Sequence, residues 1–221
     1  SLDGEVVRGF GVIRRCGVGG KIGPLFAERG EVAVLARTSS LLRRVALACG
    51  QRGQVFAASD KVFRLSTAAR TLGAYLRLLA DPRAATAADV ERIGRVPPRG
   101  LPDGAARGVA RALRHGESFA AALTAASTEP WRRERLFAAG ALLDALARER
   151  SAQRIIARLR QDGGLDAHHA AQERLDGTER VQVEELAHAQ RVARGKTAAT
   201  FAAELAAEAE LLARFRRDDA V

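Results

Sequence analysis

The pattern of apolar and polar positions changes character near residue 60. Before that point the chain holds short β-branched runs, which predict strands at residues 5–12, 31–36 and 54–58. The run at 31–36 is almost wholly apolar, as in a strand covered on both faces of a sheet. A helix is expected over about 40–49, with Thr38 or Ser39 as its cap and Gly50 after its end. The first third is therefore predicted to be mixed α/β.

From residue 66 onward the apolar positions recur at helical spacing. Ser66 precedes a segment in which Leu72, Tyr75, Leu76 and Leu79 share one face. Prolines and glycines then separate further expected helices at about 86–95, 103–113, 117–126, 130–149, 151–161, 178–193 and 197–216. The predicted fold class is mainly α, with a small α/β stub over residues 1–62 and an all-helical domain over 63–221.

Charge adds an expectation about partners. The chain has 36 Lys and Arg against 26 Asp and Glu, a net charge of +10. Such an excess favours a polyanionic partner, and arginine, which supplies nearly all of the positive charge, binds phosphate well. A GC-rich genome would also enrich arginine without any function. DNA is the polyanion expected here, with the genomic explanation left open.

Membrane insertion, secretion and metal binding are not expected from the sequence. No stretch approaches 18 uninterrupted apolar residues, and the first ten residues lack the features of a secretory signal. Cys16 and Cys49 stand alone, and the four histidines lack the spacing of metal ligands. A cytoplasmic protein without a membrane partner is therefore predicted.

A glycine-rich stretch, Gly17-Val18-Gly19-Gly20-Lys21, raises the question of a nucleotide-binding loop. A Walker A loop needs a Ser or Thr after its lysine, because that hydroxyl holds magnesium. Ile22 stands in this place, and the first glycine is one position too close. The stretch is interpreted as a flexible turn, and the chain is not expected to hydrolyse ATP by itself.

Three segments, taken in order, resemble motifs of one family. Residues 32–39 (VAVLARTS) are similar to the strand and turn AVLxRTN of UvrD/Rep/PcrA-type superfamily 1 DNA helicases. Residues 75–82 (YLRLLADP) are similar to the helix YLRLLxNP of that family, and residues 95–101 (RVPPRGL) to its turn NxPxRGIG. The resemblance covers nearly the whole chain.

The resemblance implies a piece of an ATP-dependent, 3′-to-5′ DNA helicase of DNA repair. Residues 1–62 would belong to the second RecA-like lobe (2A) and residues 63–221 to its helical insertion (2B). ATP and Mg²⁺ would bind the rest of the motor, leaving this chain without a cofactor, a catalytic residue or ATPase activity of its own. Its partners would be the remaining motor and duplex and single-stranded DNA, bound without sequence preference.

The family's DNA contacts carry over to two groups of residues. The turn after the first strand would touch single-stranded DNA through Arg37, Thr38 and Ser39. The proline turn and the helix after it would grip duplex phosphates through Arg95, Arg99, Gly100, Leu101 and Arg107. Two plainer interpretations stay open: Thr38 and Ser39 can be only a helix cap, and the second group an ordinary proline turn with solvated arginines.

A different class of function also fits the helical part. Alanine-rich amphipathic helices can dock proteins, so the alternative is a protein-interaction or regulatory module of a DNA repair factor. Trp131 and Phe137 lie among alanines and leucines at helical spacing. Such aromatics either fill the core or provide platforms on which bases stack.

Overall fold

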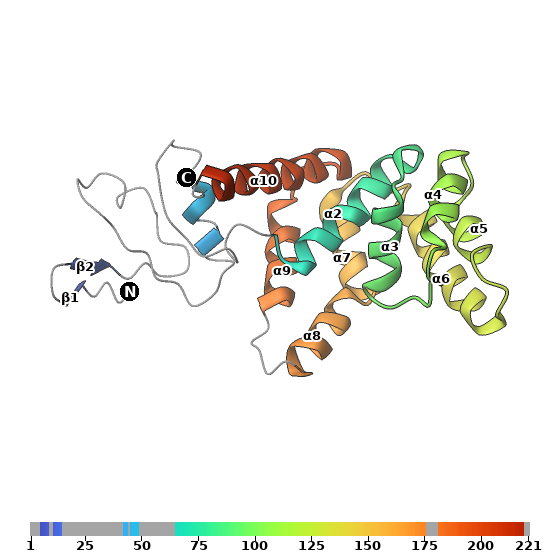
Figure 1. The fold of residues 1–221 in the computed structure, drawn as a ribbon, viewed down its shortest axis with the longest axis horizontal. Helices are drawn as coiled ribbons and strands as arrows, with labels where there is room; N and C mark the ends of the chain where they lie inside the picture. The colour runs from blue at the N-terminus through green and yellow to red at the C-terminus, as the bar shows by residue number, and fades with distance from the viewer. Residues whose placement is uncertain are drawn as a thin grey trace. The chain divides into compact units, whose positions relative to one another are not determined.

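The computed structural model describes residues 5–8, 11–14, 42–43, 45–48, 65–175 and 181–218 (Figure 1). Of residues 5–8, 11–14 and 215–218 it describes the backbone alone. The chain divides into two compact units. One comprises Ser1–Arg64 with Leu211–Val221, and the other, the helical unit, comprises Leu65–Glu210. Each unit is described by itself.

The first unit contains a β-hairpin near its start. Strand β1 (Glu5–Arg8) pairs antiparallel with β2 (Gly11–Arg14), with Val6 opposite Ile13 and Val7 opposite Val12. The single strand expected over 5–12 is therefore wrong, because the chain reverses between Arg8 and Gly11, where Gly9 is one of the two linking residues. Residues 42–43 and 45–48 are helical, within the helix expected at 40–49. The strands expected at 31–36 and 54–58 lie outside the described residues.

Helices dominate the described residues, which confirms the mainly α prediction. They are α2 (Thr67–Ala80), the short 3₁₀ helix η2 (Pro82–Ala84), α3 (Ala87–Arg95), α4 (Ala106–Arg114), α5 (Phe119–Thr124), α6 (Pro130–Leu146), α7 (Ala152–Gln161), α8 (Leu165–Leu175), α9 (Val181–Val192) and α10 (Ala198–Asp218). The α/β arrangement of the first third stays a prediction, as does the proposed domain division at residue 62.

Hydroxyl side chains begin four of these helices. Ser66, Thr86, Ser118 and Ser151 cap α2, α3, α5 and α7, each accepting a hydrogen bond from the backbone N–H three residues later. These bonds satisfy N–H groups that have no partner inside a helix. The caps at Ser66 and Thr86 stand where the sequence pattern predicted them.

Helix α8 was not expected from the sequence. Its inward positions, spaced four residues apart, are Leu165, His169 and Glu173, all buried. Two of the three are polar, so the segment shows no apolar stripe of the kind that predicts an amphipathic helix. Burial of a histidine and a glutamate on one helix face depends on tertiary partners that a linear pattern does not reveal.

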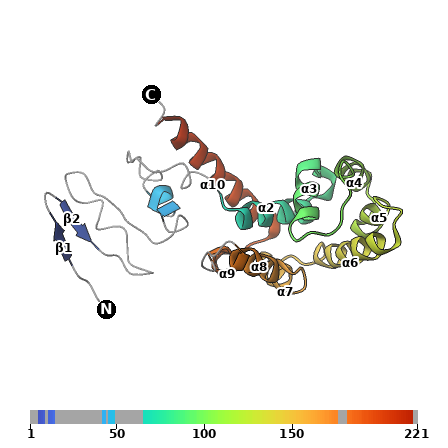
Figure 2. The same cartoon turned by 60° about the horizontal axis from the view of Figure 1, so that its bottom comes forward.

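The core of the helical unit is built around α2. This helix lies between α9 on one side and α3 on the other (Figure 1). Its side chains Leu72, Tyr75 and Leu76 are at most 2% exposed. Helices α7, α8 and α9 pack against one another, as Figure 2 shows.

Helices α5 and α6 form a closely packed pair. A Cβ placed on Gly140 of α6 would lie only 2.4 Å from the Cα of Ala120 in α5. Real Cβ atoms do not approach other atoms so closely, so the crossing requires glycine at this position.

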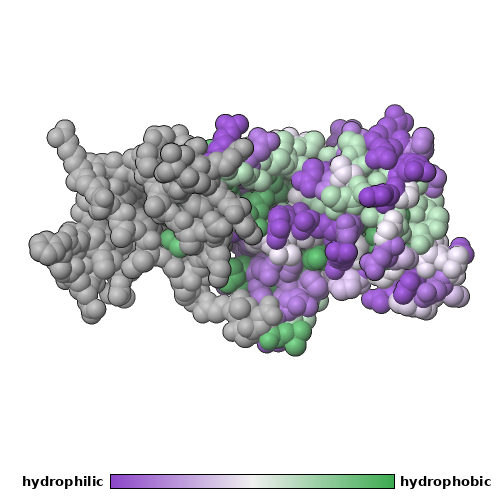
Figure 3. All heavy atoms as spheres, viewed as in Figure 1, coloured by the Kyte–Doolittle hydropathy of each residue, from purple (hydrophilic) through white to green (hydrophobic). Residues whose placement is uncertain are grey.

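Polar side chains cover much of the visible surface of the helical unit (Figure 3). Among the residues that the structure describes, no helix combines the length and the hydropathy needed to span a bilayer.

Candidate functional site

The turn between α3 and α4 carries most of the predicted DNA contacts in the described part of the chain. It folds back on the end of α3, where the N–H of Arg99 donates to the carbonyl of Gly94 at 2.8 Å. The Val96–Pro97 peptide bond is cis, and Gly100 has φ +80°, a conformation that favours glycine. The backbone hydrogen bond of Arg99 thus holds the turn against the end of α3.

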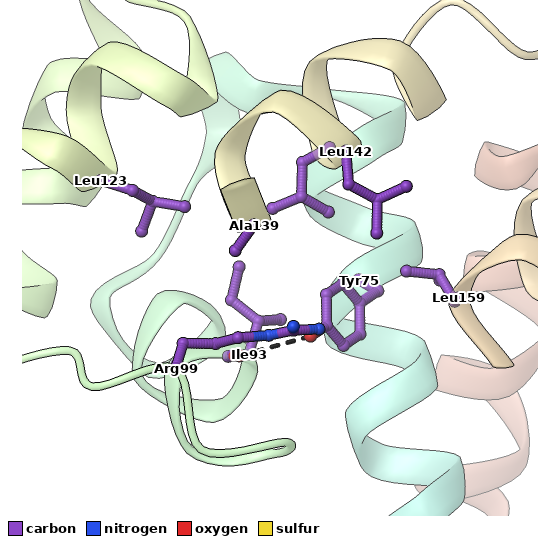
Figure 4. Close-up of a pocket in the computed structure, with 9 residues that line it drawn as sticks. Tyr75, Ile93, Arg99, Leu123, Ala139, Leu142 and Leu159 are labelled. Carbon is purple, nitrogen blue, oxygen red and sulfur yellow. Dashed lines mark hydrogen bonds between the residues drawn. The ribbon is translucent and has the colours of Figure 1, made fainter. Parts of the chain in front are cut away.

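Arg99 is bound inside this structure. Its guanidinium donates to the carbonyl oxygen of Gly163 at 2.5 Å, across 64 residues of sequence. The same side chain extends to Tyr75 of α2, as Figure 4 shows. Arg99 therefore links the turn to α2 and to the segment between α7 and α8.

Tyr75 is the buried partner at the centre of this arrangement. Its hydroxyl lies 3.3 Å from the carbonyl oxygen of Ile93 and 3.2 Å from that of Val96, and it can donate its proton to either (Figure 4). Burial raises the pKa of Tyr75, which the neighbouring Arg99 guanidinium partly offsets. A neutral, hydrogen-bonded tyrosine of this kind stabilises the fold and is not poised as a base.

A small cavity lies beside Tyr75 and Arg99 (Figure 4). Its remaining lining is mainly apolar and comes from α3, α5, α6 and α7: Ile93, Gly94, Leu123, Ala139, Leu142, Leu143 and Leu159. The cavity measures about 10 Å³, which is close to the minimum for one water molecule. It cannot hold a substrate or a nucleotide.

The other residues predicted to contact DNA differ in their exposure and in their neighbours. Arg95 is exposed and forms an ion pair with Glu91 at 2.6 Å, one helical turn earlier. Arg107 is exposed on α4, whereas Leu101 packs against the core. Gly100 lies near Trp131 and Arg132 of α6. DNA contact by these residues stays a prediction, and Arg37, Thr38 and Ser39 lie outside the described residues.

A second polar cluster joins α7, α8 and α9. Arg160 donates to both carboxylate oxygens of Asp166, with a shortest distance of 2.8 Å, and also to the side-chain oxygen of Gln190. His168 and His169 lie beside this network with ring centroids 5.2 Å apart.

The protonated, cationic form is disfavoured in both histidines. Burial, together with the smaller effect of His168, lowers the pKa of His169 to about 4, and Asp166 partly opposes this shift. Burial and then Arg99 lower the pKa of His168. Among the described residues, no three His, Cys, Asp or Glu side chains gather as metal ligands. The hydrogen bonds of Arg160 connect α7, α8 and α9 at this cluster.

The charge of the helical unit is nearly balanced. Residues 65–210 contain 22 Lys and Arg and 19 Asp and Glu, an excess of only three positive charges. Most of the net charge of +10 therefore lies elsewhere in the chain. A large basic surface of the kind that grips duplex DNA is not favoured in this unit.

Comparison with known proteins gives one match. The family described as "Acetyltransferase (GNAT) domain" matches residues 2–59. No curated protein and no solved structure matches the chain.

This match overturns the helicase assignment. Residues 2–59 are almost the same segment that was assigned to a RecA-like lobe, and they are similar to another family instead. The DNA helicase function, with its ATP-dependent hydrolase activity and its 2A and 2B domains, is therefore wrong. The three helicase-like segments consist of an apolar run with a cap, an amphipathic helix and a proline turn. These features occur in many folded chains, so they are not specific to DNA helicases.

The matched segment also includes the glycine-rich stretch that the sequence analysis interprets as a flexible turn. Four glycines, Gly17, Gly19, Gly20 and Gly23, follow the strand β2 and stand among the cations Arg14, Arg15 and Lys21. Within residues 2–59 the chain is thus similar to a GNAT acetyltransferase domain.

Proposed function

We propose that residues 2–59 form part of an acetyltransferase domain and that the helical unit is a separate accessory domain of the same protein. The observation that carries the proposal is the family match over residues 2–59. The division of the chain at Arg64 supports it, because the matched segment ends just before the helical unit begins.

The acetyl donor in this proposal is acetyl-coenzyme A. Coenzyme A is a general carrier of acyl groups, and its thioester supplies an activated acetyl group. Its phosphates require cations and backbone N–H donors. The stretch from Arg14 to Gly23 offers both, since glycine lets a phosphate approach the backbone closely and three cations stand beside the glycines.

The acceptor in this proposal is an amine. A neutral amine carries the lone pair that attacks the thioester carbonyl, and the thiol of coenzyme A leaves as the acetyl group moves to nitrogen. The helical unit offers no substrate-sized cavity at Tyr75 and Arg99, where its packing leaves only about 10 Å³. Acetyl transfer is therefore assigned to the matched segment and not to the helical unit.

The test is a calorimetric titration of the full chain with acetyl-coenzyme A. The chain contains only three lysines, Lys21, Lys61 and Lys196, so a matched pair of variants is available. Lys21→Ala should weaken binding about tenfold, the loss expected for one charge-assisted contact to phosphate. Lys61→Ala, just outside the matched segment, should leave the affinity unchanged.

Two outcomes would count against the proposal. One is the absence of any heat of binding with either acetyl-coenzyme A or coenzyme A. The other is an equal loss of affinity in both lysine variants, which would indicate nonspecific attraction between a basic chain and an anion.

A further inference from the structure

Helix α6 carries apolar side chains on two sides. Its inward side packs against α5 and the core through Leu136, Ala139, Gly140, Leu143 and Leu146. Its outer side leaves Phe137 56% exposed. Ala138, Ala141 and Ala145 are exposed as well. A helix that covered a core with one face only would carry polar residues at these positions.

The outer residues of α6 form one continuous stripe. At 100° per residue they fall within a sector of about 100° around the helix axis. The stripe consists of Glu134, Phe137, Ala138, Ala141 and Ala145 on α6, and Arg148, in the turn just after the helix ends, continues it. We call these six residues the outer face of α6. Figure 2 shows α6 along the edge of the helical unit, next to α5. Three alanines in this stripe would let a second helix approach closely.

The two ends of the outer face carry opposite charges. Glu134 lies seven residues before Ala141, and Arg148 lies seven residues after it. Both side chains are exposed, and neither has an ion-pair partner among residues 65–175 and 181–218. Because the charges are placed symmetrically about Ala141, the face is complementary to itself when one copy is turned antiparallel to the other.

We propose that the outer face of α6 binds the same face of a second copy of this chain, with the two helices antiparallel and Ala141 on the two-fold axis. In this register Glu134 lies opposite Arg148 of the partner subunit, and Phe137 lies opposite Ala145 of the partner subunit. Each contact occurs twice, as an isologous interface requires. The apolar contacts of Phe137 supply most of the affinity, and the two ion pairs set the register. The interface does not depend on acetyl transfer.

Sedimentation equilibrium of the full chain measures this association directly. The chain should pass from monomer to dimer as its concentration rises from low to high micromolar. Phe137→Asp should weaken the dimer at least tenfold, because it places a carboxylate at the apolar centre. Glu117→Arg, an exposed charge reversal outside the face, should leave the dimer unchanged. Circular dichroism of each variant establishes that the helices remain folded.

Charge exchange tests the antiparallel register. Glu134→Arg and Arg148→Glu should each weaken self-association several-fold, because each places like charges opposite one another at both ends. An equimolar mixture of the two variants should dimerise as the unchanged chain does, since both ion pairs form again between unlike copies. If Phe137→Asp fails to fold, Ala141→Arg serves as the second disruption on the two-fold axis.

Three results would overturn the proposal. A chain that stays monomeric at several hundred micromolar would exclude the dimer. A dimer unaffected by both Phe137→Asp and Ala141→Arg would place the interface elsewhere. A mixture of the two charge variants that associates no better than either alone would exclude this register.

Discussion

At Gly140 a single hydrogen in place of a methyl group decides how closely two helices pack. The backbone of Ala120 occupies the position that a side chain would need, and backbone atoms cannot move aside cheaply. Arg99 shows the same dependence on distant neighbours, because its partner Gly163 is 64 residues away. The sequence pattern predicted that Arg99 contacts phosphate, but in the structure its guanidinium is hydrogen-bonded to a backbone carbonyl of the same unit.

Replacing Gly140 with alanine should therefore destabilise the protein. We expect the free energy of unfolding to fall by about 1–3 kcal/mol, the usual cost of an overpacked contact. Urea denaturation measures this change. Gly108→Ala in α4 is the matched control, because nothing lies within 4 Å of its added Cβ, and it should be neutral or stabilising by up to about 1 kcal/mol. Equal effects of the two substitutions would refute the close-packing explanation.

His169 should make stability depend on pH. Its folded pKa of about 4 lies below the ordinary value of 6.5, so the unfolded chain binds its proton more readily. The stabilising effect is complete above pH 6.5 and is lost as the pH falls toward 4. As the pH falls from 7 to 5, His169 should lower the free energy of unfolding by about 2 kcal/mol.

Urea denaturation at these two pH values checks the prediction for His169. His169→Leu should flatten the dependence between pH 7 and pH 5. His115→Gln, which alters an exposed histidine, should leave the dependence as it is. An unchanged slope in His169→Leu would show that another group is responsible.

At the scale of elements, α5 is too short to be stable alone. It has six residues and is held at its start by Ser118 and by Asp144 of α6. Asp144 accepts hydrogen bonds from the N–H groups of Phe119 at 2.8 Å and Ala120 at 3.0 Å. A negative charge at a helix start also interacts favourably with the helix dipole. The α5–α6 pair thus depends on one carboxylate as well as on Gly140.

Asp144→Ala should lower the free energy of unfolding by about 2 kcal/mol, since two N–H groups lose their partner. Thermal unfolding followed by circular dichroism measures the change. Asp162→Ala removes an exposed ion pair with Arg158 and should cost less than about 1 kcal/mol. If Asp144→Ala lowers the free energy of unfolding no more than Asp162→Ala does, Asp144 does not stabilise the start of α5.

Elements with local signals were predictable from the sequence, and those that depend on distant contacts were not. Ser66 and Thr86 began helices where expected because a cap needs only neighbours three residues away. Helix α8 was missed because His169 and Glu173 occupy its buried face. The turn at 97–101 was predicted as a turn. The partner of Arg99 could not be predicted, because Gly163 lies 64 residues away in the sequence.

At the scale of the whole molecule, the chain combines two units of different character. The helical unit is a packed domain with a nearly balanced charge, whereas the segment similar to an acetyltransferase domain lies in the other unit. The sequence revealed the change near residue 60 but not the family of the first segment. Its short motifs fitted a helicase because strands, caps and proline turns recur in many folds.

Acetyl-coenzyme A is proposed to bind through the segment at residues 2–59. The most direct measurement compares calorimetric titrations of the full chain and of a fragment comprising residues 65–210, with circular dichroism to establish that the fragment is helical and unfolds cooperatively. We expect saturable binding of acetyl-coenzyme A to the full chain and none to the folded fragment. Binding to the fragment with the affinity of the full chain, or no binding to the full chain, would contradict it.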